Sequence, residues 1–181
     1  LLSEKLADRE PLPVVIPFDG EEQALYDQLD ELIDRLMLAH GTTKGAGFVL
    51  TVYRRRLTSS WPAIRQPLTR RLDHEELLLD DDLLDEADDE EIPTTTTGTI
   101  NQAQALPLTT EEISEIRGYV ERMSFVTDSK FNRLLTDLNE SRDVGRSTIV
   151  FTQFADTLED LRERLSGAYQ YQMATFTGAG G

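Results

Sequence analysis

The stretch Ser147–Leu165, STIVFTQFADTLEDLRERL, decides the fold that we predict for this chain. Its apolar run, Thr148 to Phe151, is typical of a buried strand. Asp156 and Glu159 have the spacing of a capping box, which predicts that a helix begins there. The turn Thr152 to Ala155 lies between this strand and this helix. Because ligands bind outside the carboxyl ends of strands in open α/β sheets, we expect the functional site at this turn.

Two further apolar stretches have the character of strands. Tyr171 to Phe176 is predicted to be a second strand, ending in Thr177-Gly178. Pro13 to Phe18 has a proline near each end, which suits an edge strand. Two strands joined by a helix make a right-handed βαβ crossover with parallel strands. The predicted fold class is therefore α/β, a mostly helical region followed by a partial βαβ unit.

Apolar residues at helical spacing predict the remaining elements. A helix is expected over 20–39, with Asp19 and Glu22 as its capping box, and a second over about 48–60. Trp61-Pro62 should end the second helix, and a third, kinked at Pro67, should follow. Two more helices are expected after the N-caps Thr109, which forms a capping box with Glu112, and Asp128; the latter helix has the apolar stripe Phe131, Leu134, Leu135 and Leu138.

An acidic segment separates two predicted domains. Residues 73–91 hold twelve acids and no Lys or Arg, and the stretch that follows is polar and weakly periodic. Such a composition favours a flexible loop, which we place near 76–107. The predicted domains are therefore 1–108, a helical region that carries this loop, and 109–181. The chain begins at Leu1 and stops directly after a predicted strand, which favours an excerpt of a larger protein.

The composition excludes several classes of protein. The chain has no cysteine, which excludes disulfides and thiolate metal sites and fits a cytoplasmic location. No apolar run approaches the roughly 20 residues that span a bilayer. The net charge of −16 argues against nucleic-acid binding by the chain as a whole.

Arginines are concentrated in one acid-free segment. Six of them fall within residues 54–71: Arg54, Arg55, Arg56, Arg65, Arg70 and Arg71. Pairing with the adjacent acid run is the ordinary interpretation of such a segment. Contact with nucleic-acid phosphates is the alternative, because each neutralised phosphate releases counterions. The sequence leaves both open.

No catalytic set is evident. Asp85-Glu86-Ala87-Asp88 spells a helicase acid box, but it lies in the acidic run without a strand before it. The chain also has no G-x-x-x-x-G-K-[ST] phosphate loop, so we treat the match as coincidence. The two histidines, His40 and His74, have no partner pattern that would make them catalytic.

Five segments together resemble the Swi/Snf-type helicase-like ATPases, in particular their bacterial branch. The stretch IVFTQFADTL, from Ile149 to Leu158, is similar to the strand and helix of that family's fourth motif. The other four segments occur in the family's order: Glu22–Tyr26 (EQALY), Tyr53–Ser60 (YRRRLTSS), Asp128–Phe131 (DSKF) with Leu134-Leu135, and Thr177-Gly178.

The resemblance implies a fragment of an ATP-dependent translocase on double-stranded DNA. It covers the helical insertion between the two lobes and the start of the second, RecA-like lobe, with its βαβ unit. ATP and magnesium would bind elsewhere in the parent protein, so this chain should not hydrolyse ATP by itself. The residues implied in backbone contact are Thr152, Gln153, Thr177, Gly178 and Lys130, together with Arg54, Arg55 and Arg56.

Two other interpretations stay open at this point. The chain could be a non-enzymatic, acidic, mostly helical protein-interaction module, in which the acid run mimics DNA or docks a basic partner. It could also be a flavodoxin-like or nucleotide-binding domain with a helical insertion. A truncated sheet would leave an exposed edge strand, which favours a homodimer through that edge.

Overall fold

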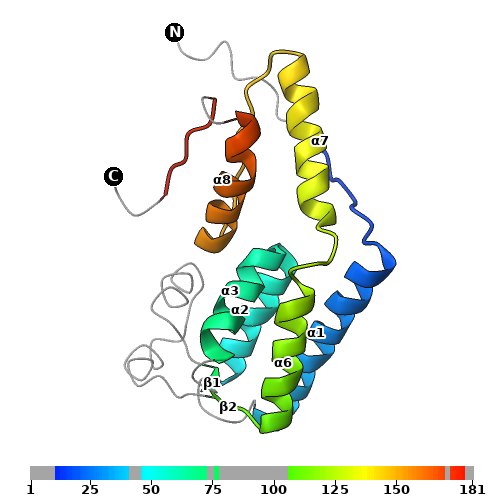
Figure 1. The fold of residues 1–181 in the computed structure, drawn as a ribbon, viewed down its shortest axis with the longest axis vertical. Coiled ribbons are helices and arrows are strands. Elements are labelled where there is room, and N and C mark those ends of the chain that lie inside the picture. The colour runs from blue at the N-terminus through cyan, green and yellow to red at the C-terminus, as the bar shows by residue number, and fades with distance from the viewer. Residues whose placement is uncertain (1–10, 41–45, 73–75, 78–105, 170–171, 178–181) are drawn as a thin grey trace.

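The computed structural model describes residues 11–40, 46–72, 76–77, 106–169 and 172–177 (Figure 1). This part of the chain contains six helices and one short antiparallel strand pair. The helices are α1 (Gly20–His40), α2 (Ala46–Ser59), α3 (Trp61–Leu72), α6 (Thr110–Arg122), α7 (Ser129–Asp143) and α8 (Ala155–Tyr169); the strands are β1 (Glu76–Leu77) and β2 (Leu106–Pro107).

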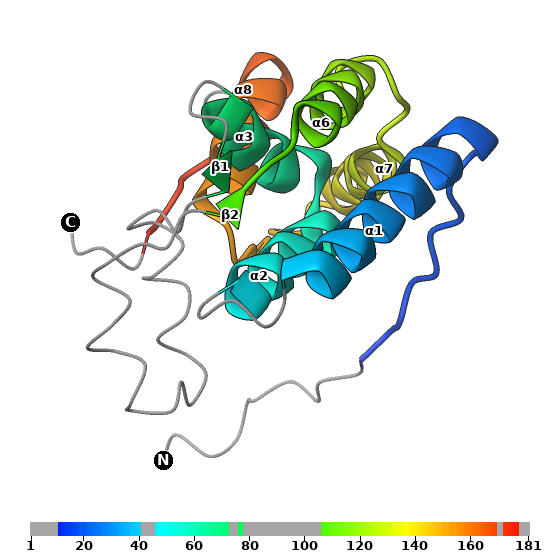
Figure 2. The same ribbon diagram turned by 90° about the horizontal axis from the view of Figure 1, so that it is seen from below.

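Helices α1, α2, α3 and α6 form a bundle around the hydrophobic core (Figures 1 and 2). Each helix contributes at least one side chain that is at most 1% exposed: Leu29, Leu50, Ile64 and Ile116. The apolar stripes that occur every three or four residues put these side chains on the inner faces. Burial of this apolar area is the main stabilising contribution to the bundle.

Helices α7 and α8 stand on one end of the bundle, with their N-terminal ends toward it (Figure 1). They are joined to each other by polar contacts: Arg164 Nη1 lies 2.6 Å from Asp128 Oδ2, and Tyr169 donates to Asn139 Oδ1 at 2.6 Å. No residue of α7 is fully buried. The apolar stripe of α7 therefore lies half-covered, in contrast to those of the bundle.

A buried carboxylate attaches α7 to the bundle. Glu22 of α1 is 1% exposed and accepts hydrogen bonds from Trp61 Nε1 at 3.1 Å and from the Ser129 backbone N–H at 3.2 Å. The Ser129 hydroxyl donates to the same carboxylate. A buried charge must be compensated by donors, so Glu22 fixes the first turn of α7 against α1 and α3.

The predicted βαβ unit is wrong. Residues 148–151 carry no strand, and Ile149 and Phe151 are 78% and 91% exposed. Residues 172–177 also carry no strand, and Phe176 is 89% exposed. The only pairing in the described part is the β1–β2 bridge. The described chain is thus helical and not α/β with a RecA-like lobe, because an apolar segment becomes a strand only when a second strand pairs with it.

The edge strand predicted over 13–18 is also absent, since those residues carry no strand and Val15 is 89% exposed. The capping box predicted at Asp156 is wrong as well. Helix α8 begins one residue earlier, at Ala155, and the Asp156 carboxylate binds arginines of the bundle instead.

Several local predictions are confirmed. The helices over 20–39 and about 48–60 correspond to α1 and α2, and α3 follows Ser60 directly and continues through Pro67. Thr109 and Glu112 form the expected capping box, and Asp128 accepts from the Phe131 N–H at 3.0 Å. Asp19 caps α1 by accepting from the Glu22 N–H at 2.8 Å. The Glu22 side chain, however, does not return to Asp19.

Among the described helices, none has the length and apolar character that a bilayer crossing requires. The helicase-like acid box at 85–88 lies outside the described residues, as does the acid run 73–91 apart from Glu76 and Leu77, which form β1.

We expect Glu22→Gln to lower the free energy of unfolding by about 1–3 kcal/mol, because an amide cannot accept from all three donors as a carboxylate does. Urea unfolding followed by fluorescence of Trp61, the only tryptophan, measures the change. The matched control is Glu21→Gln, since Glu21 is exposed on the same turn and should change stability by less than about 0.5 kcal/mol. Equal stabilities of the two variants would contradict the role of Glu22.

Candidate functional site

The candidate site lies where the first turns of α7 and α8 meet the corner between α2 and α3. We call the contacts at this place the junction. It is built almost entirely from polar side chains that come from distant parts of the sequence. The junction positions the turn Thr152 to Ala155, which immediately precedes α8.

Arg56 is the centre of the junction. Its side chain is 2% exposed, and its Nη1 donates to Asp156 Oδ2 at 2.7 Å and to the Ala63 carbonyl at 2.8 Å. Its guanidinium lies over the Phe154 ring, 4.9 Å from the ring centre. A buried guanidinium is tolerated only with such compensation. Arg56 therefore holds the start of α8 against α2 and α3.

Two further contacts strengthen the same attachment. Arg70 Nη2 lies 3.4 Å from the other carboxylate oxygen of Asp156. The hydroxyls of Ser60 and Thr157 are 2.7 Å apart and share a hydrogen bond. The first turn of α8 is thus connected to α3 by an ion pair with Arg70 and to the residue before α3 by the hydroxyl of Ser60.

Lys130 attaches α7 to the end of α2. Its ammonium donates to the Thr58 carbonyl and, at 3.1 Å, to the Ser59 carbonyl. These carbonyls belong to the last turn of α2, where backbone acceptors lack partners within the helix and a cation is favourable. Burial lowers the pKa of Lys130 below its ordinary value, and the nearby Asp128 and Glu22 carboxylates oppose that shift.

A hollow of about 270 Å³ opens beside the junction. Its polar lining comes from the α2–α3 corner, from the first turn of α7, from the 152–153 turn and from α8: Ser59, Ser60, Lys130, Thr152, Gln153 and Arg164. Thr152 shapes the turn, because its hydroxyl accepts from the Phe154 N–H at 3.4 Å. Gln153, between them, is exposed.

Three residues predicted from the sequence come together in this hollow. They are Lys130, Thr152 and Gln153. Thr177 lies exposed in the extended segment that follows α8, and Gly178 lies outside the described residues. The structure therefore brings Lys130, Thr152 and Gln153 together, whereas Thr177 does not line this hollow.

The arginines of α2 are used within the protein. Arg54 binds Asp30 at 2.7 Å and Asp34 at 2.6 Å, both on α1. Arg56 is buried at the junction, as described, and Arg55 is half-buried. The described partners of Arg54 and Arg56 are therefore acids of α1 and α8 and not the acid run, which lies outside the described residues apart from Glu76 and Leu77.

Sequence reasoning missed Arg164. It stands 3.3 Å from the centre of the Phe131 ring and binds Asp128 at 2.6 Å and Asp160 at 3.1 Å. The spacing of Asp160 and Arg164, four residues on one helix, is a signal that could have pointed to this side chain. No local sequence pattern, by contrast, pairs Arg164 with Asp128, because the two residues are 36 positions apart.

The hollow has a mixed lining, in which polar and charged side chains stand beside the apolar side chains of Pro62, Phe131, Leu134, Val150, Phe151 and Leu161. The N-terminal turns of α7 and α8 line it, and in the first turn of α7 the N–H groups of Ser129 and Phe131 already donate to the Glu22 and Asp128 carboxylates. Gln153, Thr152 and Lys130 add side-chain donors. The cations Lys130 and Arg164 alternate with the acids Asp128 and Asp160 in its wall. Among the described residues, no group of His, Cys, Asp and Glu is arranged to hold a metal ion.

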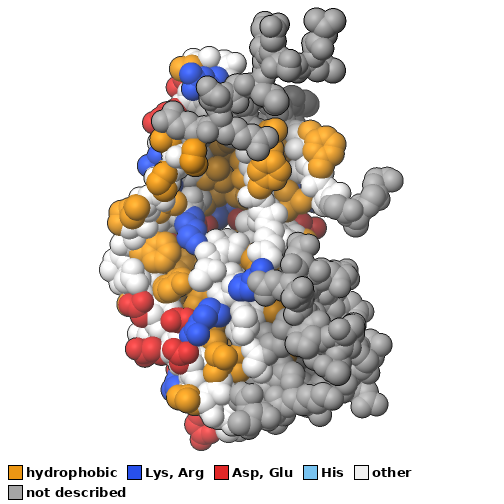
Figure 3. Space-filling model, turned by 180° about the vertical axis from the view of Figure 1, so that it is seen from behind, with side chains coloured by type: hydrophobic (Ala, Val, Ile, Leu, Met, Phe, Trp, Pro, Cys, Tyr) orange, Lys and Arg blue, Asp and Glu red, His pale blue; other side chains and the backbone are white. Residues whose placement is uncertain are grey.

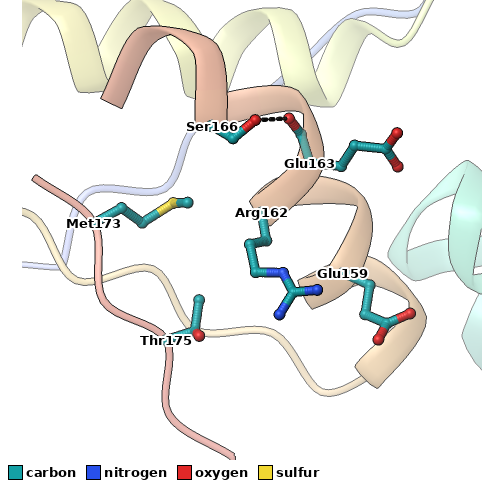
Figure 4. Close-up of a pocket in the computed structure, with 6 residues that line it drawn as sticks. All are labelled: Glu159, Arg162, Glu163, Ser166, Met173 and Thr175. Atoms are coloured by element: carbon teal, nitrogen blue, oxygen red, sulfur yellow. Dashed lines mark hydrogen bonds between the residues drawn. The ribbon is translucent and has the colours of Figure 1, made fainter. Parts of the chain in front are cut away.

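A second hollow, of about 560 Å³, lies on the other side of α8, against the extended segment 172–177 (Figure 4). Ser166, which lines it, donates to the carbonyl of Glu163 at 2.7 Å, so this hydroxyl is satisfied within α8. Its other polar residues come from two segments and do not form a site of recognisable chemistry: Glu159, Arg162, Glu163 and Thr175.

No family model matches the chain, and no match is found among the curated proteins or among the solved structures.

We expect the pKa of Lys130 to lie below 10.5, because its ammonium is partly desolvated. Between the folded-state pKa and 10.5 the unfolded chain binds more protons, so this group makes the free energy of unfolding rise with pH in that window. An NMR titration of the lysine Cε resonances measures the pKa. Asp128→Asn keeps a good N-cap and should lower the pKa further, since it removes a carboxylate that raises it.

The matched control is Asp137→Asn on the same helix, whose carboxylate binds Arg133 and should leave the pKa of Lys130 unchanged. A pKa at or above 10.5 in the unsubstituted protein would rule out the desolvated position of this ammonium.

Proposed function

We propose that this chain is part of a Swi/Snf-type DNA translocase and that the hollow beside the junction binds the phosphate backbone of double-stranded DNA. One observation carries the proposal. Four of the segments that resemble this family, which are far apart in the sequence, meet at one place in the fold.

The contacts between these segments are specific. Glu22, of the segment Glu22–Tyr26, binds Ser129 across 107 residues of sequence. Lys130 binds Ser59 across 71 residues, and Arg56 binds Asp156 across 100 residues. The resemblance and the packing therefore support each other. This support concerns the segments and their contacts, since the RecA-like lobe that the resemblance implied is absent from the described residues.

The geometry favours contact with phosphates over base recognition. Gln153 and Thr152 present short neutral donors, and Lys130 presents a cation fixed at a helix end. Donors of this kind position a protein on the duplex and carry no sequence information. In this proposal Arg54 and Arg56 have structural roles, because both form ion pairs within the protein. The proposed location of the protein is the cytoplasm. In this proposal ATP and magnesium bind elsewhere in the parent protein, because the sequence has no phosphate loop and the described residues have no acidic cluster that could hold a metal ion.

We expect the chain to bind duplex DNA weakly and with a marked salt dependence, measured by fluorescence anisotropy of a labelled duplex. Lys130→Gln should weaken binding and reduce the slope of log K against log salt by about 0.9, as expected for one lost phosphate contact. Gln153→Ala should weaken binding about five-fold, the equivalent of one hydrogen bond, with the slope unchanged.

Gln66→Ala is the matched control, because Gln66 is an exposed glutamine on α3 that does not line the hollow. If all three variants bind DNA as the unsubstituted chain does, the hollow is not the DNA site.

A specific observation also favours a second candidate, a protein-interaction module. Hydrophobic side chains gather over the half of the molecule that α7 and α8 occupy (Figure 3). Ile149 and Phe151 are 78% and 91% exposed, and Val150 is 40% exposed. Contiguous exposed apolar surface of this kind marks interaction sites. A homodimer through this exposed segment is one form of this candidate, although the sheet edge through which the sequence predicted it is absent, since residues 148–151 carry no strand.

For this second candidate we expect the weight-average mass, measured by light scattering, to rise above 20.5 kDa with concentration. The double variant Ile149→Lys, Phe151→Lys should remain monomeric, since paired like charges in an extended segment oppose edge-to-edge pairing. Leu38→Lys is the matched control, because Leu38 is 88% exposed on α1. A monomeric mass for the unsubstituted chain at all concentrations would count against the homodimer.

A further inference from the structure

We propose that Asp156 is a positioning residue for the hollow: its ion pair with Arg56 sets where Thr152 and Gln153 present their donors to a phosphate. The inference rests on the proposed function, since it describes how the same site is held in its binding geometry. Neither Arg56 nor Asp156 has to touch DNA in this scheme.

The turn is anchored immediately after Gln153. Phe154 is 3% exposed and packs beneath the Arg56 guanidinium. Asp156 binds Arg56 at 2.7 Å and Arg70 at 3.4 Å, and Thr157, 9% exposed, bonds Ser60. Three of the four residues after Gln153 thus contact the bundle.

The other side of the turn has no comparable anchor. Residues 147–151 are exposed, and among the described residues they show no backbone hydrogen bond. The preceding anchor is at Arg146, whose N–H donates to the Ser141 carbonyl at the end of α7. The position of Thr152 and Gln153 therefore depends mainly on the contacts made by the start of α8 and the residue before it.

Arg56 is held independently of Asp156. Its Nη1 also donates to the Ala63 carbonyl at 2.8 Å, and Ala63 is 0% exposed in the core of the bundle. The bundle therefore holds the Arg56 guanidinium in place, and the Asp156 carboxylate attaches the start of α8 to it. Removing the carboxylate should release the turn while the bundle stays intact.

The direction in which DNA affinity changes when Asp156 is replaced distinguishes a positioning role from a purely electrostatic one. Asp156 carries a negative charge beside a site that we assign to a phosphate. If it acted only through its charge, its removal would strengthen DNA binding. If it positions the turn, its removal weakens DNA binding although a repulsive charge has gone.

The experiment measures duplex DNA binding of the whole chain by fluorescence anisotropy at several salt concentrations, for the unsubstituted chain, Asp156→Asn and Asp156→Glu. We expect five- to ten-fold weaker binding for Asp156→Asn. For Asp156→Glu, which keeps the charge and displaces it by one methylene, we expect at least two-fold weaker binding. Hydrogen exchange should become faster at residues 153–158 in both variants and stay unchanged in α1.

Asp34→Asn is the matched control. It removes one carboxylate from the ion pairs of Arg54, on the α1–α2 side of the bundle, and should change neither DNA binding beyond a small electrostatic gain nor exchange at the turn. Circular dichroism and Trp61 fluorescence confirm that each variant is folded. If Asp156→Asn does not fold, Asp156→Glu carries the test.

Two negative results are distinguishable. DNA binding that is unchanged or stronger in both Asp156 variants, with an unsubstituted chain that binds, would overturn the positioning role and leave the proposed function standing. An unsubstituted chain that shows no salt-dependent binding would overturn the proposed function and this inference with it.

Discussion

The burial of one guanidinium constrains much of this structure. Arg56 is almost completely removed from water, so its charge must be met by acceptors inside the protein. Those acceptors come from two other helices, the Asp156 carboxylate of α8 and the Ala63 carbonyl of α3. Because the pairing fixes the start of α8 on the α2–α3 corner, it also fixes the turn that precedes α8. The hollow beside that turn exists as a consequence of this pairing.

A buried charge of the opposite sign does the same for α7. The Glu22 carboxylate is met by donors from Trp61 and Ser129, so the first turn of α7 is held on α1 and α3. The bundle, by contrast, is stabilised by an apolar core in which side chains such as Leu50 are completely buried. Helices α7 and α8 are therefore attached by polar contacts at their N-terminal ends. The apolar face of α7 stays half-covered, while Leu165 of α8 is buried.

The features that were predictable from sequence are those determined by neighbouring residues. The helical stripes and the caps Thr109 and Asp128 depend on residues three or four positions apart, and they were found correctly. The strand at 148–151 was not, because a strand depends on a partner that no local pattern reveals. Asp156 had the spacing of a cap, but Arg56, 100 residues away, determines its role. The resemblance to a family named Lys130, Thr152 and Gln153 as parts of one site. No periodicity in the sequence predicts that these three residues lie close together.

If the proposed function is correct, a chain of net charge −16 holds a phosphate through local donors and not through its overall charge. Lys130 and Arg164 alternate with Asp128 and Asp160 in its wall, so long-range attraction from this surface is weak. Binding there would depend on short-range side-chain donors, namely the Gln153 amide and the Lys130 ammonium. Short-range donors act only when they are held at the right place. A site of this kind therefore depends more on its anchoring contacts than a strongly basic surface does, and the buried Arg56–Asp156 pair supplies that anchoring.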